Sequence, residues 1–137
     1  MPSLLALPYY GWISASDPLY LATRKAVLSS QNPWWFNGTA ASGIGGPHNG
    51  LRYIWPMALV SRGWTATTDS EVAEMLSKLV NASACSGLVH ESFDQDDFAT
   101  STRPWFAWAN SYFADFVLKV IDERPHLVLK PPDADFQ

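Results

Sequence analysis

The chain has 137 residues, which is the size of one domain. Its composition is 47% hydrophobic but only 16% charged, whereas about 25% charged residues is usual, so much of the chain should be buried or face a ligand. The formal net charge is −4 and the nine Lys and Arg form no basic run, which argues against a nucleic-acid partner.

The first two helices are predicted from their capping residues and their apolar spacing. The first runs from Pro18 to about Ser30, because Asp17 suits the N-cap and proline suits the first helical position. The second covers about residues 55–66 and has little polar face, so we expect it to be buried.

The third and fourth helices repeat this amphipathic-then-buried order. The third covers about residues 69–82, where Thr68 and Glu71 have the spacing of a capping box. The fourth covers about residues 104–124 and is nearly all apolar. It ends before Pro125, because the residue before a proline disfavours helical geometry. The predicted fold class is therefore all-α, with about four main helices arranged as layered helical hairpins.

Two long connections, residues 31–54 and 84–102, separate these helices, and neither is predicted to contain secondary structure. Connections longer than about 12–15 residues are usually functional or disordered. In an up-down helical array these two connections lie at the same end. We therefore expect His48 and Glu91, one from each connection, to share one face.

Glu91 is the best candidate for proton chemistry, because the sequence gives it no role in a helix. It lies in the run His90-Glu91-Ser92-Phe93, and a general base needs a carboxylate held near its reacting water. A helix cap or a surface carboxylate is the simpler alternative. Ser92 lacks a base-and-orienter set, which argues against a serine nucleophile. The acids at 94–97 are typical of a solvated turn and lack the calcium-loop pattern.

The glycine-rich run at 43–48 ends in His48 and lacks the Gly-Lys-Ser/Thr ending of a phosphate loop. Its glycines permit tight turns or the close approach of a ligand. His48 alone is most simply a structural histidine, but beside Glu91 it becomes a ligand contact. Three His and one Cys at unrelated spacings predict no metal site, and no cofactor is expected. No apolar run reaches membrane-spanning length, so no membrane partner is expected.

Several segments occur in an order that resembles glycoside hydrolase family 125, the inverting exo-α-1,6-mannosidases. The matching segments are Pro2-Ser3-Leu4-Leu5-Ala6-Leu7-Pro8-Tyr9, Asn32-Pro33, Gly43-Ile44-Gly45-Gly46-Pro47-His48, Trp55-Pro56, His90-Glu91-Ser92-Phe93, Thr102-Arg103-Pro104-Trp105-Phe106-Ala107-Trp108-Ala109-Asn110-Ser111 and Pro125-His126-Leu127.

This resemblance implies a six-hairpin (α/α)6 barrel, hydrolysis of terminal α-1,6-linked mannose with inversion, and a mannose-containing oligosaccharide as partner. It implies that Glu91 is the general base. We expect His48, His90, Arg103 and Trp105 to contact the sugar.

The chain resembles only the C-terminal part of such an enzyme, so residues 1–137 are expected to be the base-bearing segment of the catalytic domain. In the family the general acid is an Asp from the earlier part, and the isolated chain is therefore expected to be inactive. Its inner helices would expose an aromatic face, which leaves self-association open. A truncated, non-catalytic mannose-binding or interaction module is the alternative, and an enzyme acting on another linkage is a third hypothesis.

Overall fold

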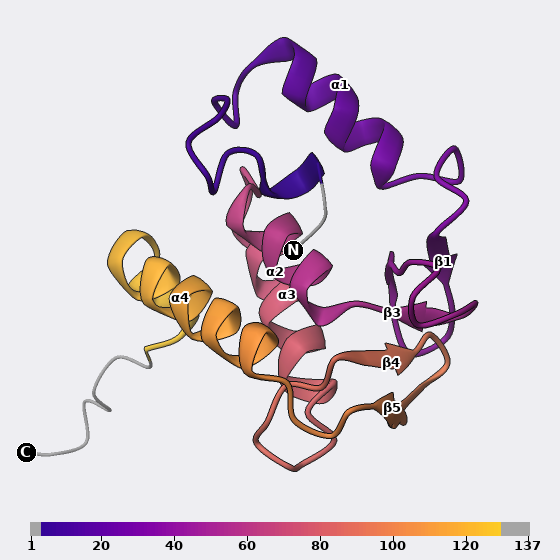
Figure 1. The fold of residues 1–137 in the computed structure, drawn as a ribbon. Coiled ribbons are helices and arrows are strands. Elements are labelled where there is room, and N and C mark those ends of the chain that lie inside the picture. The colour runs from indigo at the N-terminus through magenta and orange to yellow at the C-terminus, as the bar shows by residue number, and fades with distance from the viewer. Residues whose placement is uncertain (1–3, 130–137) are drawn as a thin grey trace, which may run out of the picture.

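The computed structural model describes residues 4–129, in which four α-helices and two short 3₁₀ helices are combined with five short strands (Figure 1). Pro2 and Ser3 of the first matching segment lie outside the described residues. The helices are η1 (Leu4–Ala6), α1 (Pro18–Val27), α2 (Pro56–Trp64), α3 (Asp69–Asn81), α4 (Ala107–Glu123) and η2 (Pro125–Leu127). The strands are β1 (Trp35–Asn37), β2 (Ser42–Ile44), β3 (Tyr53–Ile54), β4 (Ser92–Asp94) and β5 (Asp97–Thr102).

The helix starts follow the predicted capping chemistry. Asp17 accepts a hydrogen bond from the backbone N–H of Leu19 at 2.8 Å, and Pro18 takes the first helical position of α1. Thr68 accepts from the backbone N–H of Glu71 at 3.3 Å and so begins α3. The Glu71 side chain does not complete the capping box, because it binds two arginines instead.

The prediction of an all-α fold, with helical hairpins forming part of an (α/α)6 barrel, is wrong, because both long connections fold into antiparallel β-structure. The first connection supplies the hairpin β1–β2 and the strand β3, and the second supplies the hairpin β4–β5. Strand β3 pairs with β4 to make a three-stranded sheet in the order β3-β4-β5. The molecule is therefore α+β.

These strands were missed because they lack the alternation of apolar and polar residues by which strands are recognised. They are two to six residues long. Strand β4 is buried along its whole length although two of its three residues, Ser92 and Asp94, are polar. Backbone pairing on both sides of β4 and specific side-chain partners satisfy these groups, and such partners are not visible in the sequence.

The core lies where α2 packs against α3 and α4, with the sheet at one end of these helices (Figure 1). As predicted, α2 is buried over most of its length. Helix α4 is a second correction: only four of its residues are buried, and Trp108 is 66% exposed. An apolar side of α4 therefore faces outward, whereas the sequence predicted a buried helix.

No helix in the described range is long and apolar enough to cross a membrane.

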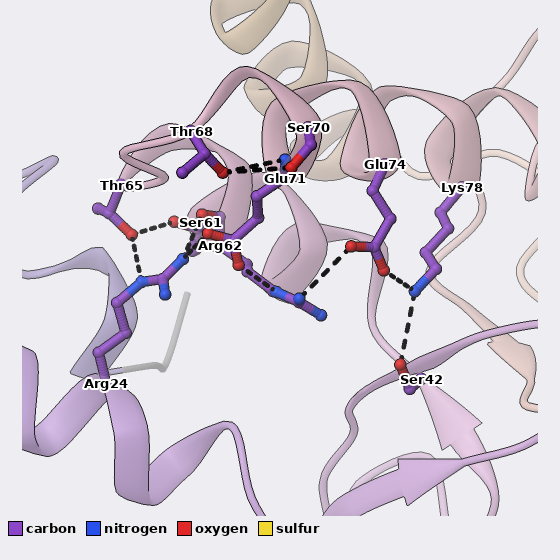
Figure 2. Close-up of polar contacts among 10 residues, drawn as sticks. All are labelled: Arg24, Ser42, Ser61, Arg62, Thr65, Thr68, Ser70, Glu71, Glu74 and Lys78. Atoms are coloured by element: carbon purple, nitrogen blue, oxygen red, sulfur yellow. Dashed lines mark hydrogen bonds and ion pairs between the residues drawn. The ribbon is translucent and has the colours of Figure 1, made fainter.

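A polar cluster around Glu71 ties α1 to α2 and α3 (Figure 2). The Glu71 carboxylate accepts hydrogen bonds from Arg24 Nη2 at 2.9 Å and from Arg62 Nε at 2.7 Å. Arg24 also donates to the backbone oxygen of Arg62 at 3.1 Å and to Thr65 Oγ1 at 3.3 Å. Burial alone would raise the pKa of Glu71, but the hydrogen bonds and charges of the two arginines outweigh it, so its pKa is lowered.

Replacing Glu71 with Gln is expected to lower the free energy of unfolding by about 1–3 kcal/mol near neutral pH, because two partly buried charge-assisted hydrogen bonds are weakened. A lowered carboxyl pKa stabilises the folded state above the ordinary value of 4.5, and this contribution is lost as the pH falls through the folded-state pKa. Urea unfolding of both chains at about pH 7 and about pH 3 measures the difference, which should shrink at the acidic pH.

Glu74→Gln is the matched control on the same helix. Its exposed carboxylate pairs with Lys78 four residues along α3, a pair type that contributes only about 0.3–0.5 kcal/mol. It also lies 3.6 Å from Arg62 Nη2, a longer contact than the 2.7 Å hydrogen bond that Arg62 donates to Glu71 (Figure 2). Equal losses from the two variants would contradict the structural role given to Glu71.

Candidate active site

Glu91 lies directly before β4 and is held there by the backbone. Its N–H donates to the carbonyl oxygens of Thr102 at 3.2 Å and Arg103 at 3.3 Å, both at the end of the neighbouring strand β5. Two residues further on, Phe93 is completely buried in the core. The backbone at Glu91 is thus fixed from both sides, and the residue is only 5% exposed.

Three groups surround the Glu91 carboxylate. Oε2 accepts a hydrogen bond from Thr102 Oγ1 at 3.1 Å and lies 3.4 Å from Arg103 Nε, whereas Oε1 lies 3.7 Å from His48 Nε2. The side chains of Arg103 and His48 are 62% and 67% exposed, so they form the open edge of the site. A nearly buried carboxylate is stable only with such partners, and two of the three partners of Glu91 are themselves exposed.

The prediction that His48 and Glu91 lie on one face is confirmed, although the reason given for it was incomplete. Strand β3, which follows His48, pairs with β4, which follows Glu91, so that Ile54 lies opposite Phe93. The sheet register brings the two segments together, rather than the meeting of two irregular loops at one end of a helical array.

Arg103 adopts a backbone conformation that is rare for its residue type, with φ at 42°. Such strain often accompanies functional sites, where the surrounding structure maintains it. Here it redirects the chain from β5 toward α4 and places the guanidinium 5.8 Å from the ring centre of Phe106. The arginine is therefore held between the Glu91 carboxylate and an aromatic face.

Trp105 is 65% exposed and lines a surface pocket of about 390 Å³ next to Arg103. The pocket wall also includes Phe106 and Trp108, so its character is aromatic with one cation at the edge. Aromatic faces of this kind can stack on the apolar face of a sugar ring.

His90, the fourth residue expected at the sugar, points elsewhere. It is 4% exposed, and its Nδ1 lies 2.5 Å from the carbonyl oxygen of Pro104. This geometry favours a structural contact that fixes the segment carrying Arg103 and Trp105.

The acidic segment at 94–97 lies at the turn of the β4–β5 hairpin, as predicted, with Asp94 opposite Asp97, but it is not fully solvated, because Asp94 is buried. Its side chains bind the protein itself. Arg52 donates two hydrogen bonds to Asp94, each at 3.0 Å, and the backbone N–H of Thr39, 2.7 Å from Asp96 Oδ1, lowers the pKa of Asp96. Within residues 4–129, no group of three or more His, Cys, Asp and Glu is arranged to hold a metal ion.

The sequence did not reveal the residues that hold the Glu91 carboxylate in place. Thr102 binds Glu91, Asn49 Nδ2 donates to Thr102 Oγ1 at 3.3 Å, and Trp55 Nε1 donates to Asn49 Oδ1. Thr102 falls within one of the matching segments, but only the pairing of β4 with β5, which sets Ser92 opposite Thr102, indicates its partner.

A larger pocket, of about 620 Å³, lies along the exposed side of α4, and its lining includes none of the residues predicted for the sugar site. Tyr9, Trp108, Tyr112 and Asp115 contribute to its wall, and the Tyr9 hydroxyl donates to Asp115 at 3.0 Å. It is separate from the carboxylate at Glu91.

Three comparisons agree on the kind of protein that this chain is similar to. A family model described as metal-independent α-mannosidase (GH125) matches residues 1–118. The meiotically up-regulated gene 157 protein of Schizosaccharomyces pombe is 48% identical over 131 residues, which are 95% of this chain and 26% of that protein.

Among solved structures, a Streptococcus pneumoniae protein from a family described as metal-independent α-mannosidases superposes with a TM-score of 0.86 at 45% identity. That structure is described as a non-productive complex with α-1,6-mannobiose, and the match covers 90% of this chain and 29% of that one. The chain thus spans between a quarter and a third of the length of these two relatives.

Proposed function

Because the chain belongs to the glycosidase family of metal-independent α-mannosidases (GH125), we propose that residues 1–137 form the base-bearing segment of an inverting exo-α-1,6-mannosidase. The observation that carries this proposal is the Glu91 carboxylate, nearly buried, anchored through Oε2 and directed through Oε1 toward the exposed His48.

In this mechanism Glu91 removes a proton from the water that attacks the anomeric carbon of the terminal mannose. Oε1 is the oxygen suited to this step, because Thr102 and Arg103 already occupy the surroundings of Oε2. A general base must lie within hydrogen-bond distance of the proton that it removes. His48, Arg103 and Trp105 would contact the sugar from the open edge of the site.

Inversion requires a second carboxyl group, about 6.5–9.5 Å from the base, to protonate the leaving oxygen. We assign this acid to a part of the related proteins that lies outside their match with residues 1–137. Residues 1–137 alone would then bind mannosides weakly and would not hydrolyse them.

The test is a segment exchange. In the S. pneumoniae mannosidase, the 29% of the chain that matches is replaced by the matching residues of this protein, and hydrolysis of α-1,2-, α-1,3- and α-1,6-mannobiose is measured. We expect hydrolysis of the α-1,6 linkage, with the β-anomer as the first product by NMR. A well-folded exchange protein without activity would contradict the proposal.

The second candidate is a non-catalytic mannose-binding module, which the exposed Trp105 beside Arg103 favours. Calorimetric titration of residues 1–137 with mannose and α-1,6-mannobiose, together with hydrolysis assays of residues 1–137 and of the exchange protein, separates the two. Binding by residues 1–137 combined with an inactive exchange protein would support the module, whereas turnover by residues 1–137 alone would contradict the assignment of the acid to another segment.

A further inference from the structure

We infer that Thr102 is the positioning residue of Glu91, and that a hydrogen-bond chain of fixed direction, from Trp55 through Asn49, turns its single hydroxyl proton toward the carboxylate. The chain joins three separate parts of the fold: the N-cap of α2, the segment after His48, and the last residue of β5. The inference rests on the proposed role of Glu91 as the base.

The direction of the chain follows from the chemistry of its first member. An indole Nε1–H can only donate, so the atom of Asn49 that faces Trp55 must be the amide oxygen. The amide nitrogen of Asn49 then faces Thr102 Oγ1 at 3.3 Å, and it too can only donate. Thr102 Oγ1 therefore accepts at this contact, and its own proton is available for another partner.

Two acceptors compete for that proton, Ser92 Oγ at 2.6 Å and Glu91 Oε2 at 3.1 Å. An ionised carboxylate cannot donate, whereas the serine hydroxyl can reverse its direction. Both contacts are satisfied only if Ser92 donates to Thr102 and Thr102 donates to Glu91. A hydrogen bond to a charged acceptor is also the stronger of the two, so this arrangement is favoured.

This arrangement makes the two carboxylate oxygens different. Oε2 is held by the Thr102 hydroxyl with Arg103 near it, and Oε1 is left facing His48 and the open edge. Rotation of the carboxylate would break the bond to Thr102, so the proton-accepting oxygen stays aimed at the water site.

The test uses the active exchange protein described above. Thr102→Val keeps the shape of the side chain and removes the hydroxyl, and kcat is expected to fall about 10- to 100-fold with KM unchanged, since the carboxylate is misdirected but no sugar contact is lost. Thr102→Ser restores the hydroxyl and should recover most of kcat. Thr100→Val is the matched control on β5, because that hydroxyl binds Asp97 at 2.7 Å and not Glu91.

Asn49→Asp tests the direction of the chain without removing Thr102. Aspartate still accepts from Trp55, but its other oxygen also accepts and so draws the Thr102 proton away from Glu91. We expect kcat to fall while the thermal unfolding midpoint stays near that of the parent, a result that remains readable even if Thr102→Val does not fold.

Three outcomes would overturn the inference: a kcat for Thr102→Val equal to that of Thr100→Val, a Thr102→Ser variant as slow as Thr102→Val, or an Asn49→Asp variant with parental kcat. None of these outcomes would contradict the role of Glu91 as the base, which is tested separately by replacing Glu91.

Discussion

Replacing Glu91 with Gln in the exchange protein is expected to lower kcat for α-1,6-mannobiose about 10²- to 10⁴-fold, the usual contribution of a general base. Glutamine has nearly the same shape and keeps an oxygen that can accept from Thr102 Oγ1. It cannot take a proton from water. The KM should change little and the thermal unfolding midpoint should stay near that of the parent, because the side-chain shape and the hydrogen bond from Thr102 are retained.

Glu123→Gln provides the matched control for this substitution. Glu123 lies in the last turn of α4 and pairs only with Lys119 at the exposed surface, among the contacts that the structure describes. Its kcat should equal that of the parent. If Glu91→Gln were as active as Glu123→Gln, then Glu91 would not be the base, and the role proposed for these residues would fail.

Replacing Gly45 with Ala is expected to destabilise the 137-residue chain by about 1–3 kcal/mol or more, as overpacking of a rigid site does. A Cβ atom at this position would lie 2.0 Å from the backbone oxygen of Tyr53 and 2.7 Å from Cε2 of Phe36. The first contact is with backbone in β3, so side-chain rotation cannot relieve it. Thermal unfolding followed by circular dichroism measures the loss, at roughly 2–8 °C per kcal/mol for domains near this size.

The neighbouring Gly46→Ala is the matched control, because a Cβ there meets nothing within 4 Å. We expect its unfolding midpoint to lie close to that of the parent. Similar losses from both glycine variants would show that the run needs backbone flexibility, rather than the close approach of β3 at one position.

The close approach of β3 to Gly45 also explains the glycine-rich run at residues 43–48. Two readings were open, a tight turn or the close approach of a ligand. In the structure both glycines lie against β3: Gly43 faces the side chain of Ile54 and Gly45 faces the backbone oxygen of Tyr53, and β3 pairs with the strand that follows Glu91. The run therefore serves the site by letting β3 lie close, with no direct contact to a ligand needed.

The helices were predictable because their signals are local. Asp17 and Pro18 start α1, Thr68 starts α3, and the apolar run of α2 matches its burial. Each of these features depends on residues within a few positions of one another. The burial of α4 could not be predicted in the same way. An apolar sequence favours burial but does not show which other element packs on the helix, and Trp108 is exposed in the structure.

Short-range sequence signals were enough to predict the four helices, and they single out Glu91 and His48 as candidate site residues. The three-dimensional structure was needed to show that the long connections contain strands, that His90 contacts Pro104, and that Thr102 donates to the Glu91 carboxylate. A helix is closed by hydrogen bonds between near neighbours. The pairing of β3 with β4 joins residues some forty positions apart, and the two hairpins, although local, lack the periodic apolar pattern by which strands are recognised.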